Sequence, residues 1–233
     1  MRRLLPLDGP DGADLAALYA PPAGRHVRAN FVVSTDGATT VGGVSSGLSS
    51  QADRDLFHVL RSLCDVVLVG ATTARRENYG GARSYDGRPP PPVAVVSRSL
   101  ELDPAARLFS DTTVRPWVLT VASAPADRRA ALSSVAHVVE AGEHSVDVPT
   151  ALDLLSAAGF DHVLCEGGPH LLSDVVVAGA LDDLCLSVAP VLAGGAGDRL
   201  LAGMPIVPPA QLRIEHVLEE EGTLFLRLST IRG

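Results

Sequence analysis

The clearest absence in this chain is lysine. All 19 basic residues among its 233 residues are arginine. The chain therefore cannot form a Schiff base through lysine, cannot use a lysine general base and has no P-loop lysine for phosphate. A composition rich in alanine, arginine and glycine accounts for the absence, and the chemical exclusion holds whatever its cause.

Other features are scarce, and each narrows the class of protein. The three cysteines, Cys64, Cys165 and Cys185, sit in apolar runs without C-x-x-C spacing, which favours buried thiols. The seven histidines form no metal-ligand pattern, so we expect no metal. No apolar run approaches the roughly 18 residues that cross a bilayer, and the N-terminus is too short for a secretion signal. We expect a cytoplasmic protein without membrane contact.

The bulk composition indicates a folded protein with a small-molecule ligand. Hydrophobic residues make up 46% of the chain and charged residues 20%, which is typical of a globular domain. The net charge of −8 argues against a nucleic-acid partner. An anionic ligand would have to be bound by local arginines and by the amino-terminal ends of helices.

Strand and helix patterns alternate after residue 24. Apolar runs predict strands at 27–34, 66–70, 93–96, 117–121, 135–140, 163–165 and 184–188, and helices at 50–62, 125–132, 149–158 and 170–178. The continuously apolar strands favour a mostly parallel central sheet with helices on both faces, an α/β fold. Two runs, 212–218 and 223–228, predict a C-terminal antiparallel hairpin. Residues 1–24 are expected to form a turn-rich extension with a short helix at 14–19, and 25–233 a single domain.

Two strand ends carry the most informative motif. The strands at 66–70 and 163–165 each run into glycine and then a helix, as VLVGATT at 67–73 and EGGP at 166–169. A helix start offers unpaired N–H groups, which suit phosphate. We therefore expect a nucleotide or phosphosugar between the two ends. Ordinary strand-to-helix connections, with Thr72 or Thr73 as a helix cap, are the alternative.

Several polar side chains could carry chemistry, each with a structural alternative. Asp36 follows the first strand and could face a pocket or make a turn. Glu166 could be an acid–base group or a solvated turn residue. The Ser97-Arg98-Ser99 cluster suits a ribose 2′-phosphate, or Arg98 is a surface arginine. Arg54 and Arg61, seven residues apart, share one face of the helix at 50–62.

In their order and spacing, these pieces resemble the reductase of riboflavin biosynthesis, the RibD C-terminal type, in its stand-alone form. The matching segments are NFVVSTDG at 30–37, 45–61, VLVGATT at 67–73, VVS at 95–97, EGGP at 166–169, LDDL at 181–184 and APVLAG at 189–194. The NYGG stretch at 78–81 resembles the actinobacterial form. The resemblance implies a dihydrofolate-reductase-like fold and a homodimer.

The resemblance also assigns roles by position. It implies that Asp36 and Glu166 handle protons or orient substrate. Positions matching cofactor contacts are Val32, Thr73, Glu77, Ser97, Arg98, Gly167, Gly168, Pro169, His170, Leu171 and Leu172. Positions on the substrate side are Asn30, Ser45, Ser46, Arg61 and Arg83, and Arg61, with Arg83, would hold the substrate phosphate. Asn30 stands where the family commonly has lysine.

The activity implied is NADPH-dependent reduction of 5-amino-6-(5-phosphoribosylamino)uracil to its ribitylamino product. The deaminase half of bifunctional RibD proteins is absent, so we expect reduction alone. Two alternatives stay open at this point: a reductase of the same fold acting on another heterocycle such as a dihydropterin, and a nucleotide-binding protein without catalysis.

Overall fold

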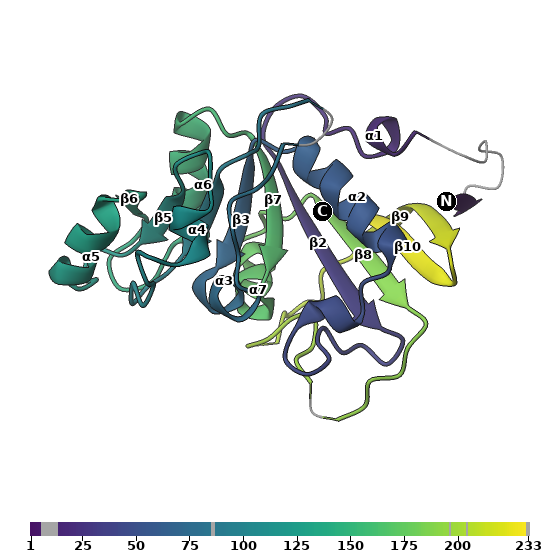
Figure 1. The fold of residues 1–233 in the computed structure, drawn as a ribbon. Coiled ribbons are helices and arrows are strands. Elements are labelled where there is room, and N and C mark those ends of the chain that lie inside the picture. The colour runs from purple at the N-terminus through teal and green to yellow at the C-terminus, as the bar shows by residue number, and fades with distance from the viewer. Residues whose placement is uncertain (6–13, 85–86, 196, 204, 232–233) are drawn as a thin grey trace.

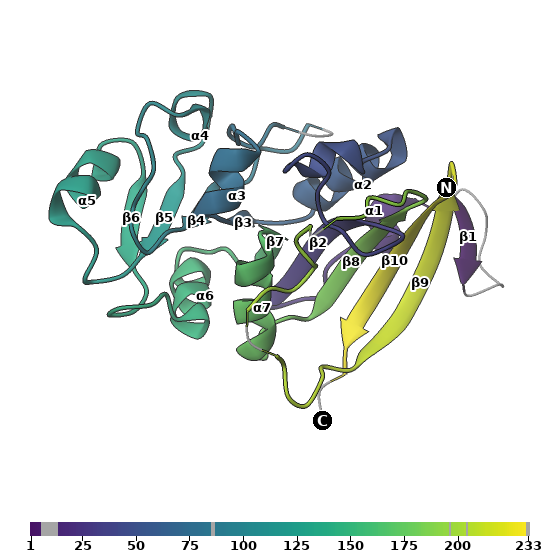
Figure 2. The same ribbon diagram turned by 90° about the horizontal axis from the view of Figure 1, so that it is seen from below.

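A single mixed sheet organises the chain. The structure is a computed structural model that describes residues 1–5, 14–84, 87–195, 197–203 and 205–231. The strands of the described part are β1 (Arg2–Leu5), β2 (His26–Ser34), β3 (Val66–Gly70), β4 (Val93–Val96), β5 (Trp117–Thr120), β6 (His137–Glu140), β7 (His162–Gly167), β8 (Asp183–Ala189), β9 (Leu212–Glu220) and β10 (Thr223–Thr230). Their order is β1-β9-β10-β8-β2-β7-β3-β4-β5-β6 (Figures 1 and 2).

The helices lie on both sides of this sheet. They are α1 (Leu15–Leu18), the 3₁₀ turn η1 (Ser45–Gly47), α2 (Gln51–Ser62), α3 (Ala71–Arg76), α4 (Arg107–Ser110), α5 (Ala126–Ser133), α6 (Val148–Ala157) and α7 (Pro169–Val177). In Figure 2, α2, α3 and α4 lie above the sheet, and α6 and α7 lie below it. The predicted layering is confirmed.

The pairing of the strands also agrees with the sequence patterns. From β8 through β2, β7, β3, β4 and β5 to β6, every neighbouring pair is parallel. The hairpin β9–β10 is antiparallel and joins the sheet at β8. The α/β fold with a mostly parallel sheet and a C-terminal hairpin is therefore confirmed.

The N-terminal segment differs from the expectation. We expected only turns and a short helix in residues 1–24, but β1 pairs with β9, with Arg2 opposite Glu219. Nothing in a four-residue segment signals a partner more than 200 residues away. The helix expected at 14–19 is present as α1, and the turn expected at 8–12 lies outside the described residues. The division at residue 24 stays a prediction.

Local signals explain where α2 and α3 begin. Ser50 caps α2, since its Oγ accepts a hydrogen bond from the Asp53 amide at 3.1 Å, as the sequence indicated. The cap of α3 is Gly70, whose backbone is extended and which offers no side chain. Capping by Thr72 or Thr73 is therefore wrong, and the side chain of Thr73 is left for the adjoining cleft.

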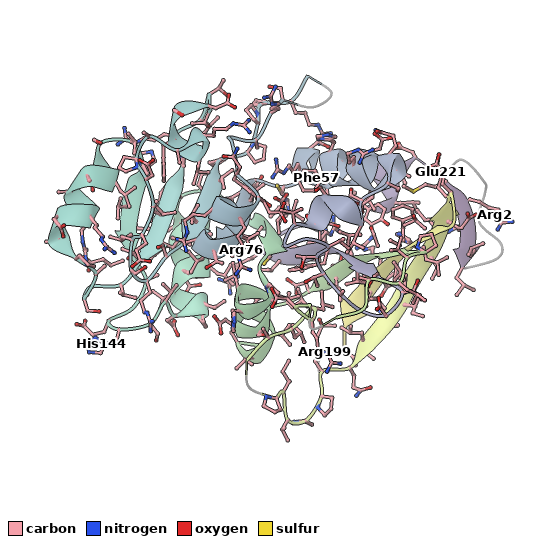
Figure 3. All side chains as sticks on the ribbon, turned by 60° about the horizontal axis from the view of Figure 1, so that its bottom comes forward. Arg2, Phe57, Arg76, His144, Arg199 and Glu221 are labelled. Carbon is pink, nitrogen blue, oxygen red and sulfur yellow. The ribbon has the colours of Figure 1, made fainter. Side chains whose placement is uncertain are left out.

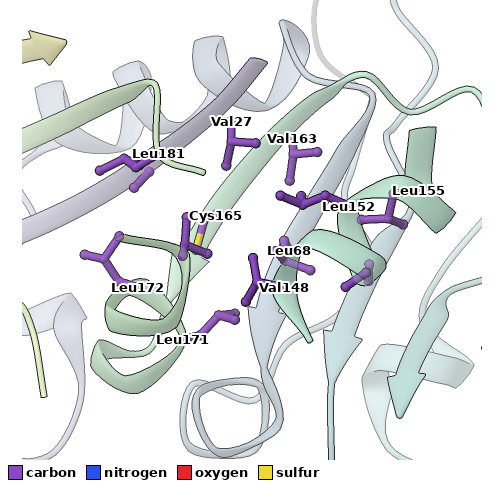
Figure 4. Packing of buried hydrophobic residues seen from close by; sticks show 14 of the residues in the cluster. Val27, Leu68, Val148, Leu152, Leu155, Val163, Cys165, Leu171, Leu172 and Leu181 are labelled. Carbon is purple, nitrogen blue, oxygen red and sulfur yellow. The ribbon is translucent and has the colours of Figure 1, made fainter. Parts of the chain in front are cut away.

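Apolar side chains hold each layer to the sheet. Between the sheet and α6 and α7, the core includes Leu68, Cys165, Leu152 and Leu172 (Figure 4). On the other face, α2 buries Leu56 and Leu60 against Leu164 and Phe225. The three cysteines have no disulfide partner. Cys165 and Cys185 are buried, as expected, whereas Cys64 is only partly buried.

A buried cluster of charges fixes α1 against the sheet. Asp183 Oδ2 accepts hydrogen bonds from Arg28 Nη2 at 3.0 Å and from Arg227 Nε at 2.9 Å, and His26 Nε2 lies 3.1 Å away. Burial raises the pKa of Asp183, but the bond to His26 and the charges of Arg227 and Arg28 outweigh it, so the pKa lies well below its ordinary value. Both arginines also donate to carbonyls at the end of α1.

His216 borders this cluster and predicts a pH effect on stability. Its ring packs edge-on against Tyr19 with centroids 4.8 Å apart, and its Nε2 has no partner among the described residues. Burial, with the charges of Arg227, Arg3 and Arg28, lowers the pKa of His216 from 6.5 to about 4. At a pH between these two values, His216 binds a proton in the unfolded chain but not in the folded chain.

We therefore expect the free energy of unfolding to fall by on the order of 2 kcal/mol as the pH drops from about 6.5 to 4. His216→Leu should remove this part of the pH dependence in urea unfolding measured across that range. The control is His144→Leu, which replaces an exposed histidine and should keep the wild-type slope. Equal slopes for wild type and His216→Leu would contradict the assignment.

Candidate active site

A cleft of about 490 Å³ opens at the carboxyl ends of the central parallel strands. Its walls come from β2, the segment 39–49, α2, α3, the segment 77–83 and the end of β7. Phe57 of α2 and Arg76 of α3, both labelled in Figure 3, are among its lining residues. The carboxyl ends of parallel strands are the usual place for a ligand in α/β folds.

The cleft gathers eleven of the eighteen site residues that the sequence analysis named. These are Asn30, Val32, Ser45, Ser46, Arg61, Thr73, Glu77, Arg83, Glu166, Gly168 and Pro169. The other seven, which do not line it, are Asp36, Ser97, Arg98, Gly167, His170, Leu171 and Leu172. Segments far apart in the sequence thus meet at one place, although not every predicted residue reaches it.

The two strand ends lie side by side. β3 and β7 are parallel neighbours, with Val69 opposite Gly167, so α3 and α7 begin next to each other. The contact is close, because a Cβ on Gly168 would lie 2.5 Å from Thr73 Oγ1. The Gly167–Gly168 peptide bond is cis. The two helix starts therefore adjoin each other, and the binding of one ligand by both of them stays a prediction.

The side chains at the start of α7 differ in whether they are accessible to a ligand. Leu171 and Leu172 point into the core beneath the helix, and the Leu172 amide already donates to the Gly168 carbonyl at 3.0 Å. His170 is exposed in the first turn of α7. Side-chain contacts from the two leucines to a ligand in the cleft are therefore excluded by their burial.

A buried ion pair forms one wall of the cleft. Arg61 donates from Nε to Glu166 Oε1 and from Nη2 to Glu166 Oε2, both at 2.7 Å. The Tyr79 hydroxyl donates to Glu166 Oε2 at 2.9 Å. The guanidinium of Arg61 lies 4.2 Å from the Phe57 ring centroid. Burial and the Glu166 carboxylate hold the pKa of Tyr79 well above its ordinary value.

Sequence reasoning did not assign Tyr79 a role. It reaches Glu166 because Asn78, two residues after the end of α3, adopts the left-handed conformation (φ 48°), and the Tyr79 amide then donates to the Ala74 carbonyl at 3.0 Å. Asparagine tolerates this conformation better than most residues. The NYGG stretch at 78–81 was the available signal, but its pattern alone names no partner for the tyrosine.

Asp36 has a different environment from the one expected. It lies outside the cleft, where Oδ1 accepts from the Ser34 hydroxyl at 2.5 Å and Oδ2 from the Gly194 amide at 2.7 Å. The Ser34 hydroxyl and the amides of Ala193 and Gly194 lower the pKa of Asp36 to about 2. An exposed carboxylate that ties down a loop and stays ionised cannot deliver a proton near neutrality. Asp36 therefore anchors residues 193–194, which argues against proton donation by this residue. A part in orienting the substrate stays a prediction.

Glu77 connects two predicted groups of residues. Its Oε1 accepts a hydrogen bond from the Ser45 amide at 2.8 Å, which holds η1 at the cleft. The hydroxyls of Ser45 and Ser46 have no hydrogen-bond partner in the described part of the chain. Glu77 therefore positions a pair of free hydroxyls, whatever else it contacts.

Ser97 and Arg98 lie just outside the cleft. β4 pairs with β3 so that Val96 is opposite Gly70, which puts Ser97 beside the start of α3. Ser97 is buried, and its amide donates to the Leu119 carbonyl at 2.9 Å. Arg98 is exposed and makes no hydrogen bond or ion pair with any residue that the structure describes. Its guanidinium is available to a ligand that extends along the strand ends.

Comparison with known proteins identifies the family. The model of the RibD C-terminal domain matches residues 25–222. The chain belongs to the RibD C-terminal domain family. A relative from Methanothermobacter thermautotrophicus, named 2,5-diamino-6-ribosylamino-4(3H)-pyrimidinone 5′-phosphate reductase, is 32% identical over 180 residues, which cover 76% of this chain and 82% of the relative.

Solved structures agree with membership of the RibD C-terminal domain family. A pyrimidine reductase-like protein from Corynebacterium diphtheriae is 28% identical, with a TM-score of 0.81 over 90% of this chain and 93% of that one. A dihydrofolate reductase from Enterococcus faecalis, 11% identical, has a TM-score of 0.50 over 89% of this chain and 97% of that one, and shares the fold. The expected dihydrofolate-reductase-like fold is thus confirmed.

The described residues contain neither a candidate metal cluster nor a candidate membrane-spanning helix. No group of three or more His, Cys, Asp or Glu side chains is placed to hold a metal ion within those residues. No helix in the same part of the chain has the length and apolar character needed to cross a membrane.

The two glycines that follow Tyr79, Gly80 and Gly81, differ in the space around them. A Cβ on Gly81 would lie 2.7 Å from the Thr112 backbone, which cannot yield. A Cβ on Gly80 would meet the ends of the Arg107 and Asp111 side chains at 3.2 and 3.3 Å and the Asp111 carbonyl at an ordinary contact distance of 3.6 Å. Gly81→Ala should lower the free energy of unfolding by about 1–3 kcal/mol. Gly80→Ala, the neighbouring control, should change it by much less in the same urea titration. Equal effects of the two substitutions would contradict this packing.

Proposed function

We propose that this chain is an NADPH-dependent reductase of riboflavin biosynthesis, which reduces the ribosyl group of 5-amino-6-(5-phosphoribosylamino)uracil to the ribitylamino product. One observation carries the proposal: two adjoining helix starts open on the same cleft as the Arg61–Glu166 pair. The first feature suits a dinucleotide and the second a polar sugar. An enzyme of this kind is expected to work in the cytoplasm.

The proposed coenzyme site runs along the strand ends. The amides at the starts of α3 and α7, with the Thr73 hydroxyl and the Gly168 amide, would bind the pyrophosphate, because helix starts attract anions. Pro169 has no N–H to donate and would line the site by contact alone. The adenosine end would extend over β4 toward Ser97 and Arg98. The unpaired guanidinium of Arg98 supports a contact to a 2′-phosphate, and hence a preference for NADPH over NADH.

The proposed substrate lies between this site and α2. NADPH supplies the hydride, and the residues of the cleft orient the sugar carbon that receives it. Glu166, held by Arg61 and Tyr79 on two sides, is rigid enough to accept a hydrogen bond from a sugar hydroxyl and fix its direction. Its bidentate bond to Arg61 needs the carboxylate form, which favours orientation over proton donation. Asn30 and Val32 complete the wall from β2.

The decisive experiment is turnover with defined substrates. We expect reduction of the phosphoribosylamino pyrimidine, tested with both the 2-oxo compound and the 2-amino compound after which the archaeal relative is named, and faster rates with NADPH than with NADH. Glu166→Gln should lower kcat by about 100-fold or more, since it removes the carboxylate that orients the sugar. NADPH affinity, followed by energy transfer from Trp117, should stay close to wild type.

The control is Glu101→Gln, which removes an exposed carboxylate outside the cleft and should leave turnover unchanged. Retained NADPH binding shows that Glu166→Gln is folded. Turnover of a dihydropterin but of neither pyrimidine, or an unchanged kcat in Glu166→Gln, would contradict the proposal.

We also propose that the enzyme is a homodimer. The hairpin carries exposed apolar side chains, among them Leu212 and Ile214, the latter 50% exposed. No helix of the described chain covers the hairpin on the side of α6 and α7 (Figure 2). A second copy of the chain is the partner that best fits this surface, since oligomers of identical chains are the commonest assemblies.

Ile214→Glu should therefore shift the sedimentation coefficient from that of a dimer to that of a monomer at micromolar concentration. The matched control is Ala130→Glu on α5, an exposed position at the opposite edge of the sheet, which should stay dimeric. A wild-type protein that sediments as a monomer would refute the assembly.

A further inference from the structure

Four buried polar atoms around the Asp183 charge cluster have no hydrogen-bond partner among the residues that the structure describes. They are Tyr19 Oη, Arg28 Nε, His216 Nε2 and Arg3 Nε. Buried polar groups normally have a partner, and each one that lacks it destabilises the fold. Four such atoms in one part of the molecule therefore indicate a ligand that supplies what the protein's own side chains do not.

Strand pairing places two of these atoms on one face of the sheet. Arg28 of β2 is opposite Asp183 of β8. His216 of β9 is opposite Arg227 of β10. Residues opposite each other in neighbouring strands point to the same face. Because Asp183 accepts hydrogen bonds from both arginines, the side chains of all four residues share that face.

Arg3 and Tyr19 lie at the same place. Arg3 of β1 is opposite Leu218, two residues after His216 on β9, so its side chain lies on the same face of the sheet. Tyr19 follows the end of α1, and its ring packs edge-on against the His216 ring with centroids 4.8 Å apart. The guanidinium carbon of Arg28 lies 5.9 Å from the centroid of the Tyr19 ring. Side chains from α1, β1, β2 and β9 thus meet on one face of the sheet.

Positive charge is in excess at this place. Three guanidinium groups and one carboxylate act on the His216 ring, those of Arg227, Arg3, Arg28 and Asp183. Oδ2 of Asp183 is shared by Arg28 and Arg227. Arg3 makes no ion pair with any carboxylate in the part of the chain that the structure describes. Since a buried charge without a counter-charge is costly, this excess favours an anion over a neutral ligand.

All four unpartnered atoms can donate a hydrogen bond. The Nε atoms of Arg28 and Arg3 each carry a hydrogen and cannot accept. Burial holds the pKa of Tyr19 well above its ordinary value, so its hydroxyl keeps its proton. The neutral ring of His216 can carry its hydrogen on Nε2. An acceptor without hydrogens of its own therefore satisfies all four atoms, whereas a water molecule would bring two hydrogens that need acceptors in turn.

Burial limits the size and the charge of the ligand. Tyr19, Arg28 and His216 are 0%, 4% and 3% exposed. A ligand that they surround loses nearly all of its hydration, and this loss costs more for a doubly charged ion than for a singly charged one. A small monovalent anion therefore fits better than sulfate or phosphate.

We infer that Tyr19, Arg28, Arg3 and His216 form a binding site for a small monovalent anion such as chloride. The ion accepts hydrogen bonds from the Tyr19 hydroxyl and from the two Nε groups, and it joins α1 and β1 to the rest of the sheet. The site lies near the amino-terminal ends of β2 and β8, whereas the candidate active site is a cleft at the carboxyl ends of the central strands. Binding of the anion is therefore independent of the proposed function.

Thermal unfolding with chloride in place of gluconate, at constant ionic strength, tests the site. At about pH 8 His216 is neutral in the folded and in the unfolded chain. Chloride should then raise the Tm of the wild-type protein by about 2–4 °C, because a ligand that binds only the folded state stabilises it. Tyr19→Phe keeps the ring and breaks no hydrogen bond of the hydroxyl to a described residue, and it should weaken the apparent chloride affinity by about tenfold or more.

Two neighbouring arginines of β1 supply a matched pair of variants. Arg3→Gln removes a donor of the site and should weaken the chloride response. Arg2→Gln, the control, removes an exposed arginine that pairs with Glu219 at 3.3 Å, and it should respond to chloride as the wild type does. A wild-type Tm that does not change with chloride would overturn the inference, as would an equal chloride response in wild type and Tyr19→Phe.

Crystals of the wild-type protein grown in bromide provide a second readout that does not depend on the stability of any variant. Bromide replaces chloride and scatters anomalously, so we expect an anomalous peak within hydrogen-bond distance of Tyr19 Oη and Arg28 Nε. A water molecule, or a group of the chain itself, bound to these two atoms without an anomalous signal would overturn the inference.

Discussion

The cleft depends on one buried pair of charges. Arg61 on α2 and Glu166 on β7 are separated by 105 residues in the sequence, and their two hydrogen bonds join a helix on one face of the sheet to a central strand. Tyr79 adds the segment after α3 to the same carboxylate. A carboxylate so deeply buried is stable only when its acceptor sites are filled, so all three elements must be in place together. The shape of the cleft follows from that requirement.

Because the chain has no lysine, an arginine side chain is the cation in each of these buried ion pairs. A guanidinium can bind both oxygens of a carboxylate in a fixed plane, whereas an ammonium group acts as a point charge. Arg61 binds Glu166 in this two-pronged way, and Arg28 and Arg227 each use further donors on the backbone carbonyls of α1 while they hold Asp183. A single arginine thus fixes both a charge and a piece of the backbone.

Sequence patterns within single segments predicted most of the fold. The features that they missed depend on contacts between segments far apart in the sequence. The apolar run at 66–70, the Ser50 cap and the spacing of Leu56 and Leu60 are local signals, and β3 and α2 appear where these signals placed them. β1 was missed because its pairing with β9 is invisible in four residues. The motifs at 70–73 and 166–169 pointed to one site because parallel neighbours end at one edge. The anchoring contacts of Asp36 were missed because the amides that bind it lie 157 and 158 residues away.

The place of β2 in the sheet constrains the order of assembly. Its neighbours are β7 and β8, so His26 cannot pair until His162 has been made, nor Ser34 until Ala189 has been made. Strands β3 to β6, in contrast, can pair with one another in chain order. During synthesis both edges of β2 stay without partners until β7 (residues 162–167) has left the ribosome, and one edge stays so until β8 (residues 183–189) has followed. Long-range pairing of this kind slows folding and exposes unpaired strand edges to aggregation. The strand that bears Asn30 and Val32 is thus made more than 120 residues before either of the two strands that enclose it.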